Sequence, residues 1–225
     1  MIAAETVHVE ILHDKDFGVF PTDDAHTALD YLSRIAGRFD VVRESRLIQI
    51  ADDPYSTKSP TFDNFPSGKA DINIVFTGRP IEFEPSHPKF MDETIAHGLA
   101  YGGLGYDKSI ALVDMSQGAI PGNAKSVIVH EIGHLLGLKR DGTVGEDGVH
   151  CALTTCNMSR YNEVQERDIV MRAAKIHQRI FKKEIKQTRS DILIPFCGEC
   201  EEQFSMNVYY RQLAKRGVKV AERFR

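Results

Sequence analysis

The sequence predicts one mixed α/β domain of the α+β kind, with about five strands. Two observations lead to this class. Apolar and polar residues alternate in several short segments, as they do in strands, whereas elsewhere apolar residues recur every three or four positions, as they do in helices. The 225 residues, with 42% hydrophobic content, are also enough for a core that needs no disulfide scaffold.

The first part of the chain is predicted to contain two strands and one helix. Residues 7–12 alternate apolar and polar side chains, the pattern of a strand. Apolar positions between residues 25 and 39 are spaced by three and four. They follow Asp23 and Asp24, which are N-cap candidates, so this segment is predicted to be an amphipathic helix. Residues 41–50 are predicted to form the second strand.

The middle of the chain continues this alternation of elements. Residues 51–69 are rich in Pro, Ser, Asp and Thr and are predicted to form a loop. Three strand-like segments follow, at residues 71–77, 97–101 and 109–114. A helix is then predicted over residues 124–138, followed by a polar loop to residue 149.

The last part of the chain is predicted to be mainly helical. A long helix is predicted over residues 162–186, because apolar side chains recur at helical spacing between residues 169 and 185. A final helix is expected over residues 201–215.

Charge and hydropathy exclude several classes of protein. The 28 basic and 32 acidic residues give a formal net charge of −4, which argues against nucleic-acid binding through bulk charge. No apolar run approaches the roughly 18 residues of a membrane span, and residues 1–15 are too polar for a secretory signal. We therefore expect a cytoplasmic monomer without nucleic-acid or membrane partners, in a compartment where thiols stay reduced.

The strongest functional signal is the pentapeptide HEIGH at residues 130–134. Positions four apart on a helix project from the same face, so the imidazoles of His130 and His134 can reach one cation, and neutral imidazole suits zinc. Glu131 can contact a water at that cation without being a ligand. Apolar runs on both sides make these polar groups costly to bury unless they are paired, which favours a metal site over a chance spacing.

Gly137 follows His134 by three residues and can end the helix with a positive φ. This arrangement resembles the first half of the metzincin pattern, H-E-x-x-H-x-x-G-x-x-H. The place of the third histidine is taken by Arg140, whose guanidinium stays protonated and cannot bind zinc.

A second group of residues resolves this conflict. The sequence continues with His150, Cys151, Cys156 and Met158, and at long range with Cys197 and Cys200. This string, H-C-x4-C-x-M followed by C-x-x-C, resembles the archaemetzincins, a family of zinc metallopeptidases. In that family the third histidine directly precedes the first cysteine but follows the glycine by three residues. We interpret residues 138–149 as carrying an insertion of about ten residues in a surface loop, which chain-closure entropy penalises only weakly.

Two other third ligands stay open. Asp141 lies one residue beyond the usual metzincin position and could coordinate through oxygen. Glu163 lies where a gluzincin-type peptidase could use a carboxylate from a following helix. His150 is the favoured ligand because of its chemistry and its place beside Cys151.

The four cysteines form two short knuckles, Cys151-x4-Cys156 and Cys197-x2-Cys200. Closed tetrahedral zinc sites with thiolate ligands have this form. The resemblance implies that all four hold a second, structural zinc. Two disulfides or four unused thiols are the alternatives.

The resemblance also assigns Met158 to the Met-turn, as an apolar floor beneath the catalytic zinc. Tyr161, three residues later, is an oxyanion-stabilising candidate, although a structural tyrosine is the favoured interpretation. In metzincins the strand before the last one lies along the cleft, and an extended substrate adds to it as a further strand. The corresponding residues here are His97, Gly98, Leu99, Ala100 and Tyr101.

The fold implied by the resemblance is metzincin-like, with a twisted mixed five-stranded sheet, a backing helix and an active-site helix. A cleft would divide one catalytic domain into two subdomains. Residues 1–137 would hold the sheet and end in the active-site helix. Residues 138–225 would hold the Met-turn, the cysteine site and further helices.

The implied function is that of a zinc metallopeptidase, a hydrolase that binds two zinc ions per chain and acts on a peptide or protein. A metal-activated water would attack the peptide bond with Glu131 as general base. The alternatives are a zinc-stabilised peptide-binding module without turnover, or a gluzincin-type peptidase or amidase with a carboxylate as third ligand.

Overall fold

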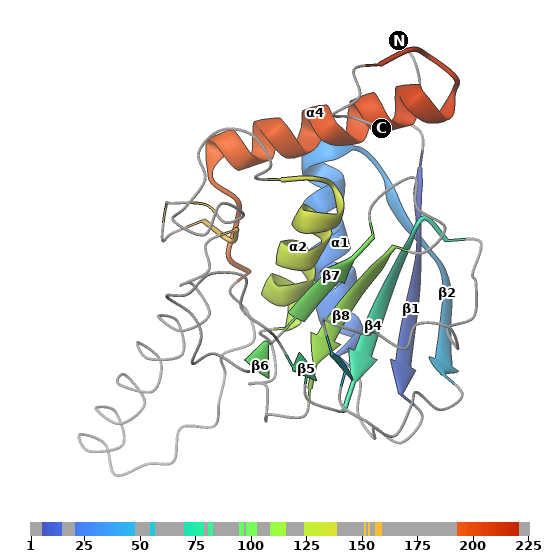
Figure 1. Cartoon of the computed structure of the whole chain (residues 1–225), viewed down its shortest axis with the longest axis vertical. Coiled ribbons are helices and arrows are strands. Elements are labelled where there is room, and N and C mark those ends of the chain that lie inside the picture. Colours follow the sequence, from blue (N-terminus) through green and yellow to red (C-terminus); the bar gives the residue numbers. More distant parts are fainter. Residues whose placement is uncertain are drawn as a thin grey trace.

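The structure of the protein is a computed structural model. It describes residues 6–14, 21–47, 55–56, 70–78, 81–82, 95–96, 98–102, 109–115, 124–138, 151, 153, 156–158 and 193–220. Figure 1 shows a sheet with helices packed against it and across one of its ends.

Five strands form the main sheet in the spatial order β2-β1-β4-β8-β7. They are β1 (Val7–Asp14), β2 (Phe39–Leu47), β4 (Ile72–Thr77), β7 (Gly98–Tyr101) and β8 (Ile110–Asp114). The first four strands of this order are parallel, and β7 runs antiparallel to β8 at the edge of the sheet. The predicted mixed five-stranded sheet is therefore confirmed.

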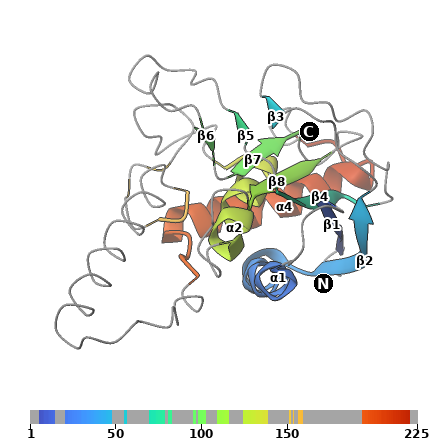
Figure 2. The ribbon, with the colours of Figure 1, turned by 90° about the horizontal axis from the view of Figure 1, so that it is seen from below.

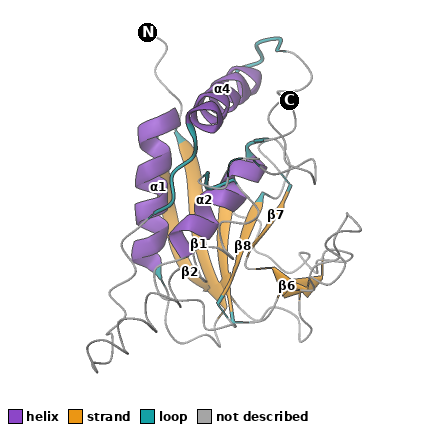
Figure 3. Ribbon diagram, turned by 90° about the vertical axis from the view of Figure 1, so that its left-hand side faces the viewer, coloured by secondary structure: helices purple, strands orange, loops and turns teal. Residues whose placement is uncertain are grey.

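The described residues also contain three helices, α1 (Thr22–Ala36), α2 (Ala124–Leu135) and α4 (Gly198–Lys215). In Figures 2 and 3, α1 and α2 lie on one face of the main sheet. Figure 1 shows α4 crossing the ends of both helices. Helix and strand boundaries differ from the predicted ones by no more than three residues.

Alternate residues of the strands point to the helices and form the core. Val9 and Ile11 of β1 lie beside Ile72 and Ile74 of β4, and all four are buried. The same core includes buried side chains of all three helices, among them Leu29, Leu32, Ile128, Ile132, Phe204 and Val208. The apolar faces that residue spacing predicts for the strands and helices are therefore the faces that pack in the core.

A second sheet lies on the side of the main sheet away from α1 (Figure 2). It consists of β3 (Tyr55–Ser56), β5 (Ile81–Glu82) and β6 (Ile95–Ala96), in the order β3-β5-β6. Strands of two residues cannot show an alternating pattern, so the sequence does not predict them. β3 corrects the prediction that residues 51–69 form only a loop.

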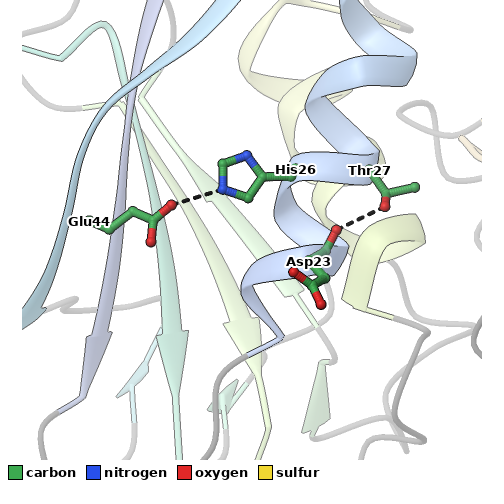
Figure 4. A network of polar contacts seen from close by, with 4 residues as sticks. All are labelled: Asp23, His26, Thr27 and Glu44. Atoms are coloured by element: carbon green, nitrogen blue, oxygen red, sulfur yellow. Dashed lines mark hydrogen bonds and ion pairs between the residues drawn. The ribbon is translucent and has the colours of Figure 1, made fainter.

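The start of α1 differs from the prediction. Pro21 precedes the helix, whereas Asp23 and Asp24 lie in the first turn, where acidic side chains interact favourably with the helix dipole. Figure 4 shows two contacts of this region: the hydroxyl of Thr27 donates to the carbonyl of Asp23 at 2.8 Å, and Nε2 of His26 lies 2.8 Å from a carboxylate oxygen of Glu44. The second contact joins α1 to β2, but its exposure to water makes it weak.

The predicted helix over residues 162–186 lies outside the described residues, and the predicted division into subdomains at residue 137 stays a prediction. Across the described ranges, no helix combines the length and apolarity that crossing a membrane would require.

Candidate metal centres

The two histidines of the HEIGH motif meet on one face of α2. Nε2 of His134 lies 3.0 Å from Nε2 of His130, and the ring centroids are 4.7 Å apart. Two nitrogens bound to one tetrahedral zinc, each at roughly 2.0–2.1 Å, would be about 3.3 Å apart. The pair therefore fits a shared cation with only a small movement of the rings.

The other ring nitrogen of His130 decides which nitrogen faces the metal. Nδ1 lies 2.7 Å from the backbone carbonyl oxygen of Asn157. A carbonyl only accepts, so Nδ1 carries the hydrogen and donates it. In the neutral ring, Nε2 then holds the lone pair that a zinc ion needs.

Glu131 is buried against the edge strand β7, with only 5% of its surface exposed. A β-carbon at Gly98 would lie 2.5 Å from the carboxylate oxygen Oε1 of Glu131 and 2.6 Å from Cγ1 of Val127. The carboxylate therefore occupies space that any other residue at position 98 would fill. The general-base candidate and the substrate-strand candidate are in direct contact.

Helix α2 ends at a Schellman-type turn. Gly137 has a φ of +76°, its N–H donates to the carbonyl of His134 at 2.9 Å, and the N–H of Leu138 donates to the carbonyl of Gly133 at 3.0 Å. The predicted helix-ending role of Gly137 is confirmed. The turn ends α2 directly after the second histidine.

Met158 packs beneath the turn of α2 that carries the histidines. It is fully buried, and its sulfur would lie 2.5 Å from a β-carbon at Gly133. The glycine in the middle of the motif therefore makes room for the methionine.

The four cysteines lie together, three of them buried and Cys197 half-buried. Sulfur–sulfur distances are 3.3 Å for Cys197–Cys200, 3.4 Å for Cys156–Cys200 and 3.9 Å for Cys151–Cys197. A tetrahedral zinc–thiolate site has sulfurs about 3.8 Å apart, whereas a disulfide bond is about 2.05 Å long. All four are thiols rather than disulfides, and together they form a possible metal site.

Local structure explains how the two knuckles meet. Cys197 is the N-cap residue of α4, and Cys200 lies in its first turn, so the C-x-x-C spacing places both sulfurs at one helix end. The N–H of Cys151 donates to the carbonyl of Met158 at 2.8 Å, which closes the other knuckle. The N–H of Cys197 donates to the sulfur of Cys156 at 3.2 Å and joins the two.

These hydrogen bonds favour the thiolate form of Cys156. The hydrogen bond between the sulfurs of Cys156 and Cys200, helped by backbone N–H groups, lowers the pKa of Cys156 to about 5 despite its burial. A thiolate is the form of cysteine that binds metal.

Tyr31 of α1 holds the segment that leads into Cys197. Its hydroxyl accepts a hydrogen bond from the N–H of Phe196 at 2.6 Å and donates to Glu201 at 3.1 Å. Burial, above all, raises the pKa of Tyr31 well beyond its usual range. The backing helix therefore contacts both the chain before the cysteine cluster and the helix after it.

Several predicted site residues lie outside the described part of the chain. These are His150, its alternatives Asp141 and Glu163, and also His97 and Tyr161. The structure brings together His130, Glu131 and His134 with Gly98 and Met158, whereas the third ligand stays a prediction. The sequence did not indicate the roles of Gly98, Gly133 and Asn157, which depend on contacts between distant segments.

Comparison with solved structures shows which known fold this chain shares. The crystal structure of an archaemetzincin from Methanopyrus kandleri is similar to this chain with a TM-score of 0.54 and 17% identical residues, over 89% of this chain and 95% of the other. The chain has an archaemetzincin-like fold. No protein-family model matches the sequence, and comparison with curated proteins gives no match.

Two further solved structures are similar to this chain with lower TM-scores. An archaemetzincin from Archaeoglobus fulgidus, in complex with malonate, is 18% identical, over 87% of this chain and 99% of that one, with a TM-score of 0.46. A zinc-dependent peptidase from Methanocorpusculum labreanum is 16% identical, over the same shares, with a TM-score of 0.42. At such identities the likeness concerns the fold alone, so the chemistry must be argued from the residues of this chain.

Proposed function

We propose that this protein is a zinc-dependent metallopeptidase that hydrolyses peptide bonds in a peptide or protein. The proposal rests on one observation: the Nε2 atoms of His130 and His134 converge 3.0 Å apart on the helix that also carries the buried Glu131. Burying the carboxylate of Glu131 and the imidazole of His130, with His134 half-buried next to them, is costly for folding unless they serve a common purpose. The archaemetzincin-like fold supports the same interpretation.

The catalytic zinc would be held by His130, His134 and His150. When bound, zinc supplies a Lewis acid, which lowers the pKa of water to about 7 and polarises a carbonyl group. The tautomer of His130 fits this role because its hydrogen is on Nδ1, toward Asn157.

Glu131 would act as the general base and then as the general acid. Its carboxylate would accept a proton from the attacking water and deliver it to the amine that leaves. Packing against the backbone of Gly98 fixes the orientation of the carboxylate before substrate binds. Such fixed placement lowers the entropy cost of the proton transfer.

The substrate would bind along β7. This strand pairs with β8 on one side and forms the edge of the main sheet on the other. An extended peptide that adds to this edge would run beside Gly98, and therefore beside the carboxylate of Glu131. The proposed substrate-binding residues are His97, Gly98, Leu99, Ala100 and Tyr101.

The cysteine cluster would hold the second, structural zinc, and Met158 would form the apolar floor of the Met-turn. The spacing of the four sulfurs supports the first role. The packing of Met158 under Gly133 supports the second. Four cysteines as thiols also fit the expected cytoplasmic location of a monomeric enzyme.

Substitution of Glu131 tests the proposal. Glu131→Gln should lower kcat/KM for peptide hydrolysis by about 10²- to 10⁴-fold, the usual contribution of a general base, and should leave the zinc content unchanged. Glu202→Gln, the same change at an exposed position of α4, should have wild-type activity. A wild-type protein that binds both metals and peptides but hydrolyses nothing would instead be the binding module.

A further inference from the structure

Asn157 lies where the two candidate metal centres meet. It directly follows Cys156 of the cysteine cluster, and its backbone carbonyl accepts the hydrogen from Nδ1 of His130 at 2.7 Å. Only 3% of its surface is exposed. One buried residue therefore contacts the first histidine and is bonded through the chain to a cysteine of the cluster.

The side chain of Asn157 fixes the position of its own backbone. Its amide Nδ2 donates to the carbonyl of Ser126 on α2 and to the carbonyl of Ile194, each at 3.1 Å. Its backbone N–H donates to the carbonyl of Pro195 at 2.9 Å. These three hydrogen bonds join helix α2, the segment 156–158 and the segment 194–195 that leads to Cys197.

The side-chain oxygen of Asn157 has no hydrogen-bond partner in the part of the chain that the structure describes. A buried acceptor without a partner is unfavourable. The hydrogen bonds of this side chain are therefore made by the two N–H groups of its amide. Among side chains of this length, only asparagine has two such donors. The requirement for two donors indicates a specific role for Asn157, because any small polar side chain could otherwise fill this place.

We propose that Asn157 is a positioning residue that holds His130 in its metal-binding tautomer and orientation and ties them to the cysteine cluster. The inference rests on the proposed function, because it concerns the histidine pair of that site. A hydrogen bond to the second ring nitrogen fixes both the rotation of an imidazole and the nitrogen that is left for the metal. Here the acceptor is a carbonyl whose place depends on the Asn157 side chain.

The test compares Asn157→Ala with a matched control, Ser126→Ala. The hydroxyl of Ser126 accepts a hydrogen bond from the N–H of Ile194 at 3.2 Å, so the control removes another bond between the same two segments. Both Asn157 donors remain in that control, because Asn157 binds the backbone carbonyl of Ser126.

The probe is Co²⁺, added to the metal-free full chain. Thiolate-to-cobalt charge-transfer absorption reports the cysteine cluster, and the second equivalent of bound metal reports the histidine pair. Asn157→Ala should weaken the second equivalent by about 10- to 100-fold, the usual effect of losing the partner of a metal-binding histidine. Ser126→Ala should change it by less than about threefold.

The tautomer of His130 is read in the metal-free protein by ¹⁵N NMR, with the resonance assigned by its loss in His130→Asn. Wild type and Ser126→Ala should carry the hydrogen on Nδ1, whereas Asn157→Ala should show a mixture of tautomers. Unchanged affinity and tautomer in Asn157→Ala, or equal losses in both variants, would overturn the inference.

If Asn157→Ala does not fold, the ¹⁵N spectrum of the wild-type protein tests the inference. A hydrogen on Nε2 of His130 would overturn the inference, and a hydrogen on Nδ1 would support it. A wild-type protein that binds no second equivalent would fail differently. That result would overturn the proposed metal site itself, together with the inference that depends on it.

Discussion

The carboxylate of Glu131 rests on the backbone of Gly98. A β-carbon at position 98 would stand 2.5 Å from Oε1 and 2.8 Å from Cγ of Glu131. The helix that carries the candidate general base and the strand at the edge of the sheet therefore fit together only because residue 98 has no side chain.

Gly98→Ala should displace Glu131 and lower kcat for peptide hydrolysis by up to about 10²-fold, because small misplacements of a reacting group have large effects. The zinc content should stay unchanged, since the three atoms nearest to the new methyl group belong to Glu131 and Val127 and not to the histidines. Steady-state kinetics and metal analysis check both parts. A wild-type kcat in Gly98→Ala would show that the position of the Glu131 carboxylate does not depend on the absence of a side chain at residue 98.

Gly198→Ala is the matched control for this and the two glycine variants that follow. Apart from its chain neighbours and the nearby backbone of α4, none of the described residues has an atom within 4 Å of a β-carbon at position 198. It should leave kcat and the unfolding midpoint close to wild type.

Gly133→Ala should destabilise the protein, although alanine stabilises an ordinary helical position by about 1 kcal/mol relative to glycine. The reason is the sulfur of Met158, 2.5 Å from the added carbon, and overpacking of a core costs about 1–3 kcal/mol. Urea unfolding measures the change. In a double-mutant cycle, Met158→Ala should remove much of the Gly133→Ala effect. Additive losses would show that the two residues do not compete for space.

Gly137→Ala should lower the free energy of unfolding by about 1–2 kcal/mol, since a residue with a β-carbon is strained in the left-handed region. Gly137 has a φ of +76° at the turn that ends α2. Thermal and urea unfolding give the change. Stability equal to that of Gly198→Ala would mean that the chain leaves α2 by another route.

Tyr31→Phe should lower the free energy of unfolding by about 1–3 kcal/mol, because the buried N–H of Phe196 loses its acceptor. Burial raises the pKa of Tyr31 in the folded state, so its contribution is complete below the unfolded pKa of about 10 and is lost as the pH rises above that value. Wild-type stability should therefore fall more steeply than that of Tyr31→Phe as the pH rises above about 10. Parallel curves would contradict this assignment.

The main sheet and three helices could be predicted because each has a local signature in the sequence. Alternation marks β1, and spacing by three and four marks α1. The edge position of β7 and the cysteine cluster were predicted from a family resemblance, because no local pattern states which distant segments meet. Cys151 and Cys197 lie close together in space only because α4 returns to the helices of the core.

The remaining features could not be predicted for physical reasons. Strands of two residues, such as β3, carry no period. The roles of Gly98 and Gly133 depend on the side chains of Glu131 and Met158, which fold back from other segments. A glycine alone indicates only conformational freedom or space, not which neighbour uses that space.

The most direct test of the account is a crystal structure of the zinc-loaded protein, with anomalous diffraction data collected at the zinc edge. We expect two zinc peaks per chain, one bound by His130, His134 and His150 and the other by the four cysteines. A zinc peak at His130 and His134 with the imidazole of His150 far from it, or no zinc peak there at all, would contradict the proposed catalytic centre.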